Sequence, residues 1–230
     1  MTDLHTHILP GMDDGAQSVE EALEMLRVLR QQGVDTVALT PHFYADEETI
    51  TVFLSRRQKA WEAFFEKAKG PEYPKLILGA EVAWMPEMSE WPDLDKLCYQ
   101  DTSVLLVELP TMPWTSTMFQ QLYSMENRRG VMPMIAHIDR YFSIQRRESI
   151  EKLLETGYPI QISCDAFLRI RTRKKALKVI AEHEGVLISD CHNLLERAPR
   201  WDKALKIIKK RLGSRIASEV TSITDEMLAD

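Results

Sequence analysis

The chain of 230 residues is 44% hydrophobic and 28% charged, which suffices for the buried core of one α/β domain. Its 29 basic and 35 acidic residues give a formal net charge of −6, so it lacks the basic footprint of a nucleic-acid-binding protein. The N-terminal segment is acidic and carries histidines, and no run approaches about 18 apolar residues. We therefore expect a single cytoplasmic domain over residues 1–230, without membrane insertion.

Seven apolar segments of strand length alternate with amphipathic helical patterns along the chain. The strands are predicted at residues 3–7, 34–40, 75–82, 103–109, 131–137, 158–163 and 185–189. The helices are predicted at residues 18–33, 47–70, 115–129, 147–156, 172–184, 202–212 and 214–229. Parallel strands need crossover connections, so this alternation predicts a parallel sheet covered by helices.

The residues at the ends of these strands distinguish a barrel from an open doubly wound sheet. Side chains capable of chemistry end six of the strands, whereas an open doubly wound sheet would gather them at one switch point. We therefore predict an α/β fold with a distorted, seven-stranded, TIM-like (β/α)7 barrel. The segment from Glu81 to Asp101 reads as a connection within this domain.

Five of the six histidines lie at the ends of predicted strands. His5 and His7 are two residues apart on the first strand, and alternation along a strand points both side chains to one face. Three further strands each close on a histidine: His42, His137 and His192. The sixth histidine, in the polar stretch AEHEG at 181–185, is predicted to be a solvated surface residue.

Carboxylates follow the same pattern. Glu81 and Glu108 end strands, Asp190 precedes His192 by two residues, and Asp13 and Asp14 share a glycine-bracketed turn in which one acid caps the turn. Imidazole and carboxylate donors without thiolate favour manganese, iron or zinc. Nine such donors exceed the roughly three that one catalytic zinc takes, which indicates two or three ions. Closely spaced ions polarise a phosphoryl oxygen and activate water, so hydrolysis of a phosphate ester is the expected chemistry.

Two arginines stand where a phosphate would need them. Arg140 follows His137 by three residues, and Arg197 follows His192 by five. Arginine binds phosphate oxygens through a planar, permanently charged fork. Cys191 and Arg197 reproduce the spacing of thiolate-dependent phosphatases, but the intervening HNLLE lacks the glycines of a phosphate-binding loop, so we expect Cys191 to be a buried, inert thiol.

Six motifs, spread in order over nearly the whole chain, resemble the PHP (polymerase and histidinol phosphatase) family of metal-dependent phosphoesterases. Within it, the chain is most similar to the bacterial protein-tyrosine phosphatases of capsular and exopolysaccharide operons. The motifs are DLHTHILPGMDDGA (3–16), TPH (40–42), GAE (79–81), VEL (107–109), IAHIDRY (135–141) and SDCHNLLER (189–197).

The resemblance implies a trinuclear centre, most readily occupied by Mn²⁺, in a seven-stranded distorted barrel. It implies three ligand groups, with one residue shared: His5, His7, Glu81 and Asp190; Glu81, Glu108 and His137; Asp14, His42 and His192. It also implies that Arg140 and Arg197 bind phosphate. The expected substrate is the phosphotyrosine tail of a cognate bacterial tyrosine kinase that regulates capsular or extracellular polysaccharide synthesis.

Two alternatives keep the metal ligands but change the function. One is a small-molecule phosphatase of the histidinol-phosphate type, and the other is a metal-binding regulator without catalysis. Four residues in the loops after the second and fourth strands either line an apolar slot for a phenyl ring or only pack those loops: Phe43, Tyr44, Met112 and Trp114.

Overall fold

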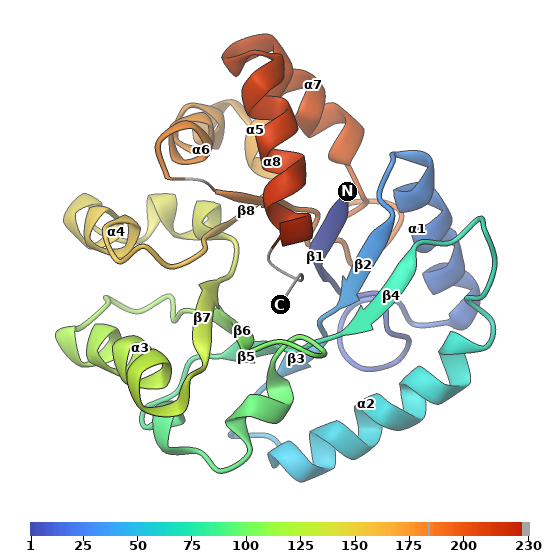
Figure 1. Cartoon of the computed structure of the whole chain (residues 1–230), viewed down its shortest axis with the longest axis horizontal. Helices are drawn as coiled ribbons and strands as arrows, with labels where there is room; N and C mark the ends of the chain where they lie inside the picture. Colours follow the sequence, from blue (N-terminus) through green and yellow to red (C-terminus); the bar gives the residue numbers. More distant parts are fainter. Residues whose placement is uncertain (184, 227–230) are drawn as a thin grey trace.

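The computed structural model describes residues 1–183 and 185–226 as an α/β fold in which strands surround a common centre and most helices lie outside them, while α8 extends toward the centre (Figure 1). Its strands are, in chain order, β1 (Thr2–Thr6), β2 (Thr36–Leu39), β3 (His42–Phe43), β4 (Lys75–Leu78), β5 (Glu81–Ala83), β6 (Val104–Glu108), β7 (Met132–Ile135), β8 (Gln161–Ser163) and β9 (Val186–Ile188). Every strand pairing is parallel, as the alternating pattern predicts.

The helices agree with the predicted ones to within a few residues at most of the ends that the structure describes; the predicted ends at residues 184 and 229 lie outside the described residues. They are α1 (Val19–Gln31), α2 (Ile50–Phe65), α3 (Ser116–Arg129), α4 (Arg147–Leu154), α5 (Cys164–Leu168), α6 (Ile170–Glu182), α7 (Trp201–Leu212) and α8 (Ser214–Glu226), with the short 3₁₀ helices η1 (Met88–Glu90), η2 (Leu94–Leu97) and η3 (Ile138–Ser143). The sequence pattern misses α5 and the 3₁₀ helices because elements this short carry little periodicity.

Polar side chains fix where three long helices begin. The hydroxyls of Ser18, Thr49 and Thr115 each accept a hydrogen bond from the backbone N–H three residues later, so they cap α1, α2 and α3. Gly130, with φ of 65°, ends α3 in the left-handed conformation that glycine adopts without strain. The three hydroxyl caps therefore fix the starts of α1, α2 and α3, each of which follows a loop from a strand end.

The strands fall into three hydrogen-bonded sheets, with the orders β1-β2-β4, β3-β5-β6-β7 and β8-β9. The third predicted strand, at 75–82, is divided: Gly79 separates β4 from β5, and a Cβ there would lie 2.9 Å from the Tyr99 ring. The second, at 34–40, contains β2 and is followed by a short strand that was not predicted, β3. Pro41 lacks the N–H that would continue the ladder between β2 and β3. Of the nine strands assigned in the described residues, eight lie in the seven predicted segments.

Backbone contacts connect the three sheets. Gly79 N donates to Leu39 O at 2.9 Å, and Glu81 N donates to Pro41 O at 3.1 Å. Isolated bridges join Thr6 to Cys191 and Ile135 to Ile160. As a result, the C-terminal ends of β1, β6, β7 and β9 and the first residues of β3 and β5 face a common region, where the predicted ligands lie.

Two apolar clusters occupy opposite sides of the strands. The larger one packs strand residues against the inner faces of the helices, such as Met25 and Leu29 of α1. The smaller one takes alternate strand positions and therefore faces the centre: Leu4, Ala38, Ile77, Leu106, Met134 and Ile188, together with Tyr99. Ile223 of α8 packs against this inner cluster. Within the described residues, no helix combines the length and apolar character needed to cross a bilayer.

Candidate metal centre

The predicted ligands meet at the C-terminal ends of the strands. Three groups of side chains, each with donor atoms within 4.8 Å of one another, lie there: His5, His7 and Glu81; His42, Glu81 and Glu108; and His7, Asp14, His42 and His192. Seven residues from six separate segments of the chain therefore form one connected cluster. His183, which directly follows α6, belongs to none of these groups.

Strand β1 supplies two imidazoles that converge on one point. His5 Nε2 and His7 Nε2 are 3.1 Å apart, and both side chains are fully buried. Each ring has a partner on its other nitrogen: His5 Nδ1 lies 2.8 Å from Gln161 Oε1, and His7 Nδ1 lies 2.7 Å from Asp13 Oδ2. Since both partners are acceptors, both Nδ1 atoms carry a hydrogen, and the two Nε2 atoms face each other.

Glu81 lies at the centre of the cluster. Its Oε2 atom is 3.2 Å from His5 Nε2, 3.3 Å from His7 Nε2 and 2.9 Å from His42 Nδ1. Its Oε1 atom is 2.8 Å from His137 Nε2. One fully buried carboxylate therefore contacts four imidazoles, which is the placement expected of a ligand shared between ions.

Two further carboxylates, Glu108 and Asp190, approach from neighbouring strand ends. Glu108 Oε1 lies 3.5 Å from His137 Nε2, and Asp190 Oδ1 lies 3.8 Å from His5 Nε2 and 3.7 Å from His7 Nε2. The backbones of His137 and Asp190 have φ values of 25° and 52°, which side-chain-bearing residues rarely adopt. Such strain persists where the surrounding fold enforces it, and it gathers at functional sites.

The turn after β1 separates the roles of its two acids. Asp13 accepts hydrogen bonds from His7 Nδ1, from the backbone N–H of His42 at 3.0 Å and from that of Gly15 at 2.9 Å. Asp14 projects into the cluster instead, and its side chain is 66% exposed. A Cβ on Gly15 would lie 1.9 Å from the carbonyl oxygen of His7, so only glycine permits this turn. Asp13 thus orients a ligand, and Asp14 is the acid placed to be one.

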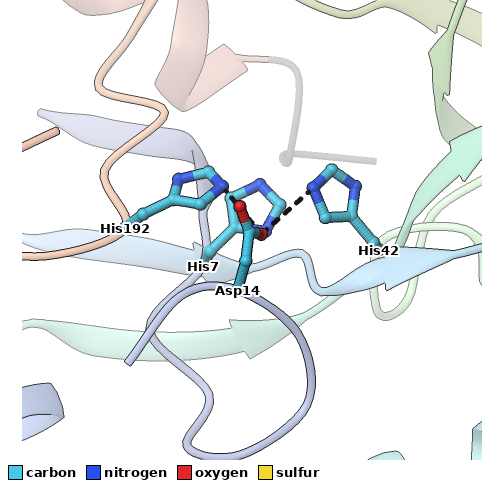
Figure 2. A group of neighbouring side chains, drawn as sticks. All are labelled: His7, Asp14, His42 and His192. Carbon is cyan, nitrogen blue, oxygen red and sulfur yellow. Dashed lines mark ion pairs between the residues drawn. The ribbon is translucent and has the colours of Figure 1, made fainter. Parts of the chain in front are cut away.

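Figure 2 shows the third of these groups, in which His192, His7 and His42 surround Asp14. Asp14 Oδ1 is 3.4 Å from His192 Nε2 and 3.6 Å from His42 Nε2. His192 Nδ1 lies 3.1 Å from the carbonyl oxygen of Asp190 and donates to it, so its Nε2 lone pair points at the carboxylate.

These donors fit divalent cations. Four buried atoms in the cluster make no hydrogen bond within the described residues: His42 Nδ1, Glu81 Oε2, His137 Nδ1 and His192 Nε2. Buried polar atoms are almost always paired, and the Nε2 atoms of His5 and His7 face each other beside these four atoms. A cation between them would satisfy both imidazoles and the Glu81 carboxylate together, and the N/O donor set is one that manganese, iron and zinc accept.

The electrostatics of the cluster are strongly coupled. Burial opposes the charged form of His7, but Asp13 and Glu81 outweigh burial and raise the pKa of His7 to about 10. Without a cation His7 is therefore protonated, and a bound cation would take the place of the hydrogen on Nε2. Burial and the neighbouring His7 lower the pKa of His192 to about 2. Burial acts to raise the pKa of Glu81, yet the surrounding histidines hold it well below its usual value. The carboxylate is therefore ionised, as a metal ligand must be.

Both predicted arginines reach the cluster. Arg140 donates to Asp190 Oδ2 at 2.5 Å and to Glu108 Oε1 at 3.3 Å. Arg197 donates to Asp190 Oδ1 at 2.8 Å. Their side chains are 37% and 34% exposed, so each guanidinium bridges the buried ligands and the solvent side of the site. Asp139 accepts from the backbone N–H of Ser163 instead of pairing with Arg140.

The loop residues considered for a phenyl slot differ in burial, and Cys191 differs in burial from a reactive cysteine. Phe43 and Trp114 are buried and pack in the larger apolar cluster, and Phe43 also lines a cavity with Ile50 and Trp91. Tyr44 stacks on His42 with ring centroids 5.2 Å apart, and Met112 is largely exposed. Cys191 is fully buried, and burial raises the pKa of its thiol well above the usual value, so it is not a thiolate nucleophile.

Sequence reasoning missed Gln161, whose carbonyl oxygen contacts His5. The available signal was a lone amide in the otherwise apolar strand segment YPIQIS at 158–163. A buried amide needs partners, and those partners were not identifiable from the sequence.

The fold and the site together define a parallel α/β protein with a cluster of N and O donors that can hold metal, beside two arginines. Comparison with protein families identifies the chain more closely, because the family model described as "Capsular polysaccharide synthesis, CpsB/CapC" matches residues 1–228. The chain therefore belongs to the CpsB/CapC family, which confirms the resemblance to the phosphatases of capsular operons.

Known members of this family are similar over nearly their full length. The chain is 29% identical to tyrosine-protein phosphatase YwqE of Bacillus subtilis, over 99% of this chain and 91% of the relative. It is 29% identical to tyrosine-protein phosphatase CpsB of Streptococcus pneumoniae, over 96% and 94%. A crystal structure from the work on these two proteins, described as unique metal-dependent tyrosine phosphatases, superposes with a TM-score of 0.78 at 26% identity, covering 100% of this chain and 94% of that one.

Proposed function

We propose that the protein is a metal-dependent protein-tyrosine phosphatase that hydrolyses phosphotyrosine on a cognate bacterial tyrosine kinase and so regulates capsular or extracellular polysaccharide synthesis. The single observation that carries this proposal is the convergence of Glu81 with His5, His7, His42 and His137 beside two arginines. Relatives named as tyrosine-protein phosphatases, one described as metal-dependent, support the reaction class.

The proposed ligands number nine and serve three divalent ions, with Mn²⁺ as the proposed metal: His5, His7, Asp14, His42, Glu81, Glu108, His137, Asp190 and His192. Bound cations would polarise the phosphoryl group and lower the pKa of water, which supplies a nucleophile near neutral pH. The chain's own task is to hold the donors in place, and buried strand ends do this for the inner ligands.

Arg140 and Arg197 are the proposed phosphate-binding residues. Each already pairs with Asp190, so each can exchange one carboxylate contact for a phosphoryl oxygen without leaving the site. A permanently charged fork at the exposed side of the cluster draws the dianion in and orients it. Cys191 takes no part, because its thiol is buried and protonated.

The proposed scaffold for this chemistry is one domain over residues 1–230, folded as a distorted, closed, seven-stranded barrel and located in the cytoplasm. Supporting evidence for closure is the continuity of backbone contacts from β9 to β1, where His7 N donates to Cys191 O at 2.9 Å, and from β7 to β8, where Ile135 N donates to Pro159 O at 2.8 Å. In this arrangement the ligands share one mouth, as in other barrels of this kind.

The experiment compares substrates on the purified protein with and without metal. We expect Mn²⁺-dependent release of phosphate from a phosphotyrosyl peptide, which EDTA abolishes and Mn²⁺ restores. Faster turnover of histidinol phosphate than of the peptide would instead support the small-molecule phosphatase. Binding of the peptide without release of phosphate at any metal would contradict the proposal and indicate a regulator.

A further inference from the structure

A buried chain of hydrogen bonds begins at the backbone carbonyl of Leu4 and ends at the candidate metal centre. A carbonyl oxygen can only accept, so the Tyr99 hydroxyl, 2.7 Å away, donates to it. The alternative acceptor for this hydroxyl, Met134 Sδ, is farther away at 3.8 Å. With its hydrogen committed to Leu4, the hydroxyl oxygen of Tyr99 can only accept from its next neighbour.

That neighbour is the side-chain amide of Gln161 on β8. Gln161 Nε2 lies 3.3 Å from the Tyr99 hydroxyl oxygen and 3.2 Å from Met134 Sδ, both of which are acceptors here. The opposite orientation of the amide would set its carbonyl oxygen against two acceptors. The amide nitrogen therefore faces Tyr99, and Oε1 faces His5.

The orientation of the amide determines the tautomer of His5. Gln161 Oε1 accepts from His5 Nδ1 at 2.8 Å, so the imidazole hydrogen is on Nδ1 and the Nε2 lone pair points to the other ligands. The side chains of His5 and Gln161 are fully buried and that of Tyr99 is 2% exposed, so water does not replace either partner. An apolar side chain would fill this inner space without the cost of burying an amide.

We propose that Gln161 and Tyr99 are positioning residues of the metal centre: they hold His5 in the tautomer that presents Nε2 to a divalent cation. This inference rests on the metal centre of the proposed function but does not depend on its substrate. Residues that orient a ligand through its far nitrogen usually change metal affinity by about 10- to 100-fold when removed.

The test is Mn²⁺ titration of the full chain by calorimetry after removal of metal with EDTA and gel filtration. Gln161→Leu removes the acceptor, and we expect Mn²⁺ affinity to fall by about 10- to 100-fold. Tyr99→Phe keeps the ring and removes only the hydroxyl, so it should weaken Mn²⁺ binding in the same direction but less. Gln32→Leu is the matched control, because this amide bridges Pro199 and Trp201 and is expected to leave Mn²⁺ affinity unchanged.

A further variant separates positioning from packing. Gln161→Glu keeps an oxygen that accepts from His5 Nδ1, so positioning predicts tighter Mn²⁺ binding than in Gln161→Leu. A packing role predicts the reverse, because a buried charge disrupts an apolar interior more than leucine does. Wild-type affinity in Tyr99→Phe, or weaker binding in Gln161→Glu than in Gln161→Leu, overturns the inference. If the wild-type protein binds no Mn²⁺, the metal centre itself fails and this inference with it.

Discussion

The inner and outer parts of the candidate site are built differently. The inner part, defined as His5, His7, Glu81 and His137, is fully buried and lies at strand ends. The outer part, defined as Asp14, His42, Glu108, Arg140 and Arg197, lies on the solvent side, with the Asp14 side chain 66% and that of Glu108 23% exposed. Packing fixes the inner donors in advance, whereas the outer residues remain able to meet a substrate.

This difference assigns separate tasks to the two parts. Inner residues should decide whether cations bind at all, because their contacts are enclosed and mutually dependent. Outer residues should decide how phosphate is held, because their charges reach the solvent. Substitutions in each part are therefore expected to separate metal content from turnover.

The largest effect is expected at the centre of the inner part. Glu81→Gln removes the charge that contacts four imidazoles, so we expect loss of Mn²⁺ and a fall in kcat/KM of more than about 100-fold, above the usual range for residues that only orient ligands. Metal analysis by inductively coupled plasma mass spectrometry and hydrolysis of p-nitrophenyl phosphate measure both. Glu90→Gln, at a surface pair with Arg128, is the control. Full metal content in Glu81→Gln would contradict the claim that the inner part decides whether cations bind.

In the outer part we expect a smaller effect, in which turnover falls but metal content does not. Arg140→Ala and Arg197→Ala each remove a proposed phosphate-binding group, and kcat/KM should fall by roughly 100-fold, as for other donors to a developing anion. Metal content should be retained, in contrast to Glu81→Gln. Arg128→Ala is the matched surface control. If these variants lose metal, and the loss of metal accounts for the whole fall in turnover, the arginines serve the inner part instead.

The adjacent acids Asp13 and Asp14 can be compared in the metal-free protein, through the thermal stability of their alanine variants. Asp13→Ala leaves two backbone N–H groups and His7 Nδ1 without their acceptor, which costs about 1–3 kcal/mol. For a chain of this size the Tm of the metal-free protein should fall by roughly 2–4 °C per kcal/mol. Asp14→Ala exposes no such group, and its Tm should match the wild type by differential scanning calorimetry. Equal melting temperatures for the two variants would contradict the assigned roles.

The smallest effect on turnover is expected at Cys191. Its thiol is buried and protonated, so Cys191→Ser should leave kcat on p-nitrophenyl phosphate essentially unchanged in the presence of Mn²⁺. Iodoacetamide labelling of the folded wild-type protein should likewise be slow. Abolished turnover in a folded Cys191→Ser protein would point to a thiolate mechanism instead.

Much of the fold and the inner part of the site could be predicted from the sequence. Histidines and carboxylates that directly follow apolar runs must share the end of a parallel sheet, and Glu81 and His137 obey this rule. The short strand β3 and the division of the third predicted strand were less apparent, because they depend on Pro41 directly after one run and on the approach of Tyr99 to Gly79 in the other.

What the sequence could not supply were contacts set by tertiary structure. Asp13 and Asp14 are chemically identical, and only the turn conformation directs one to His7 and the other to the outer part. Gln161 lies 156 residues from His5 in the chain, so no local pattern relates them. Phe43 follows a ligand directly yet is buried, since alternation turns it toward the helices.

Anomalous diffraction at the manganese edge, from crystals grown with Mn²⁺, tests the metal centre most directly. We predict an anomalous peak between His5 Nε2, His7 Nε2 and Glu81, with further peaks beside His137 and beside His192. Crystals that contain Mn²⁺ at other positions, or none at these side chains, would contradict the account.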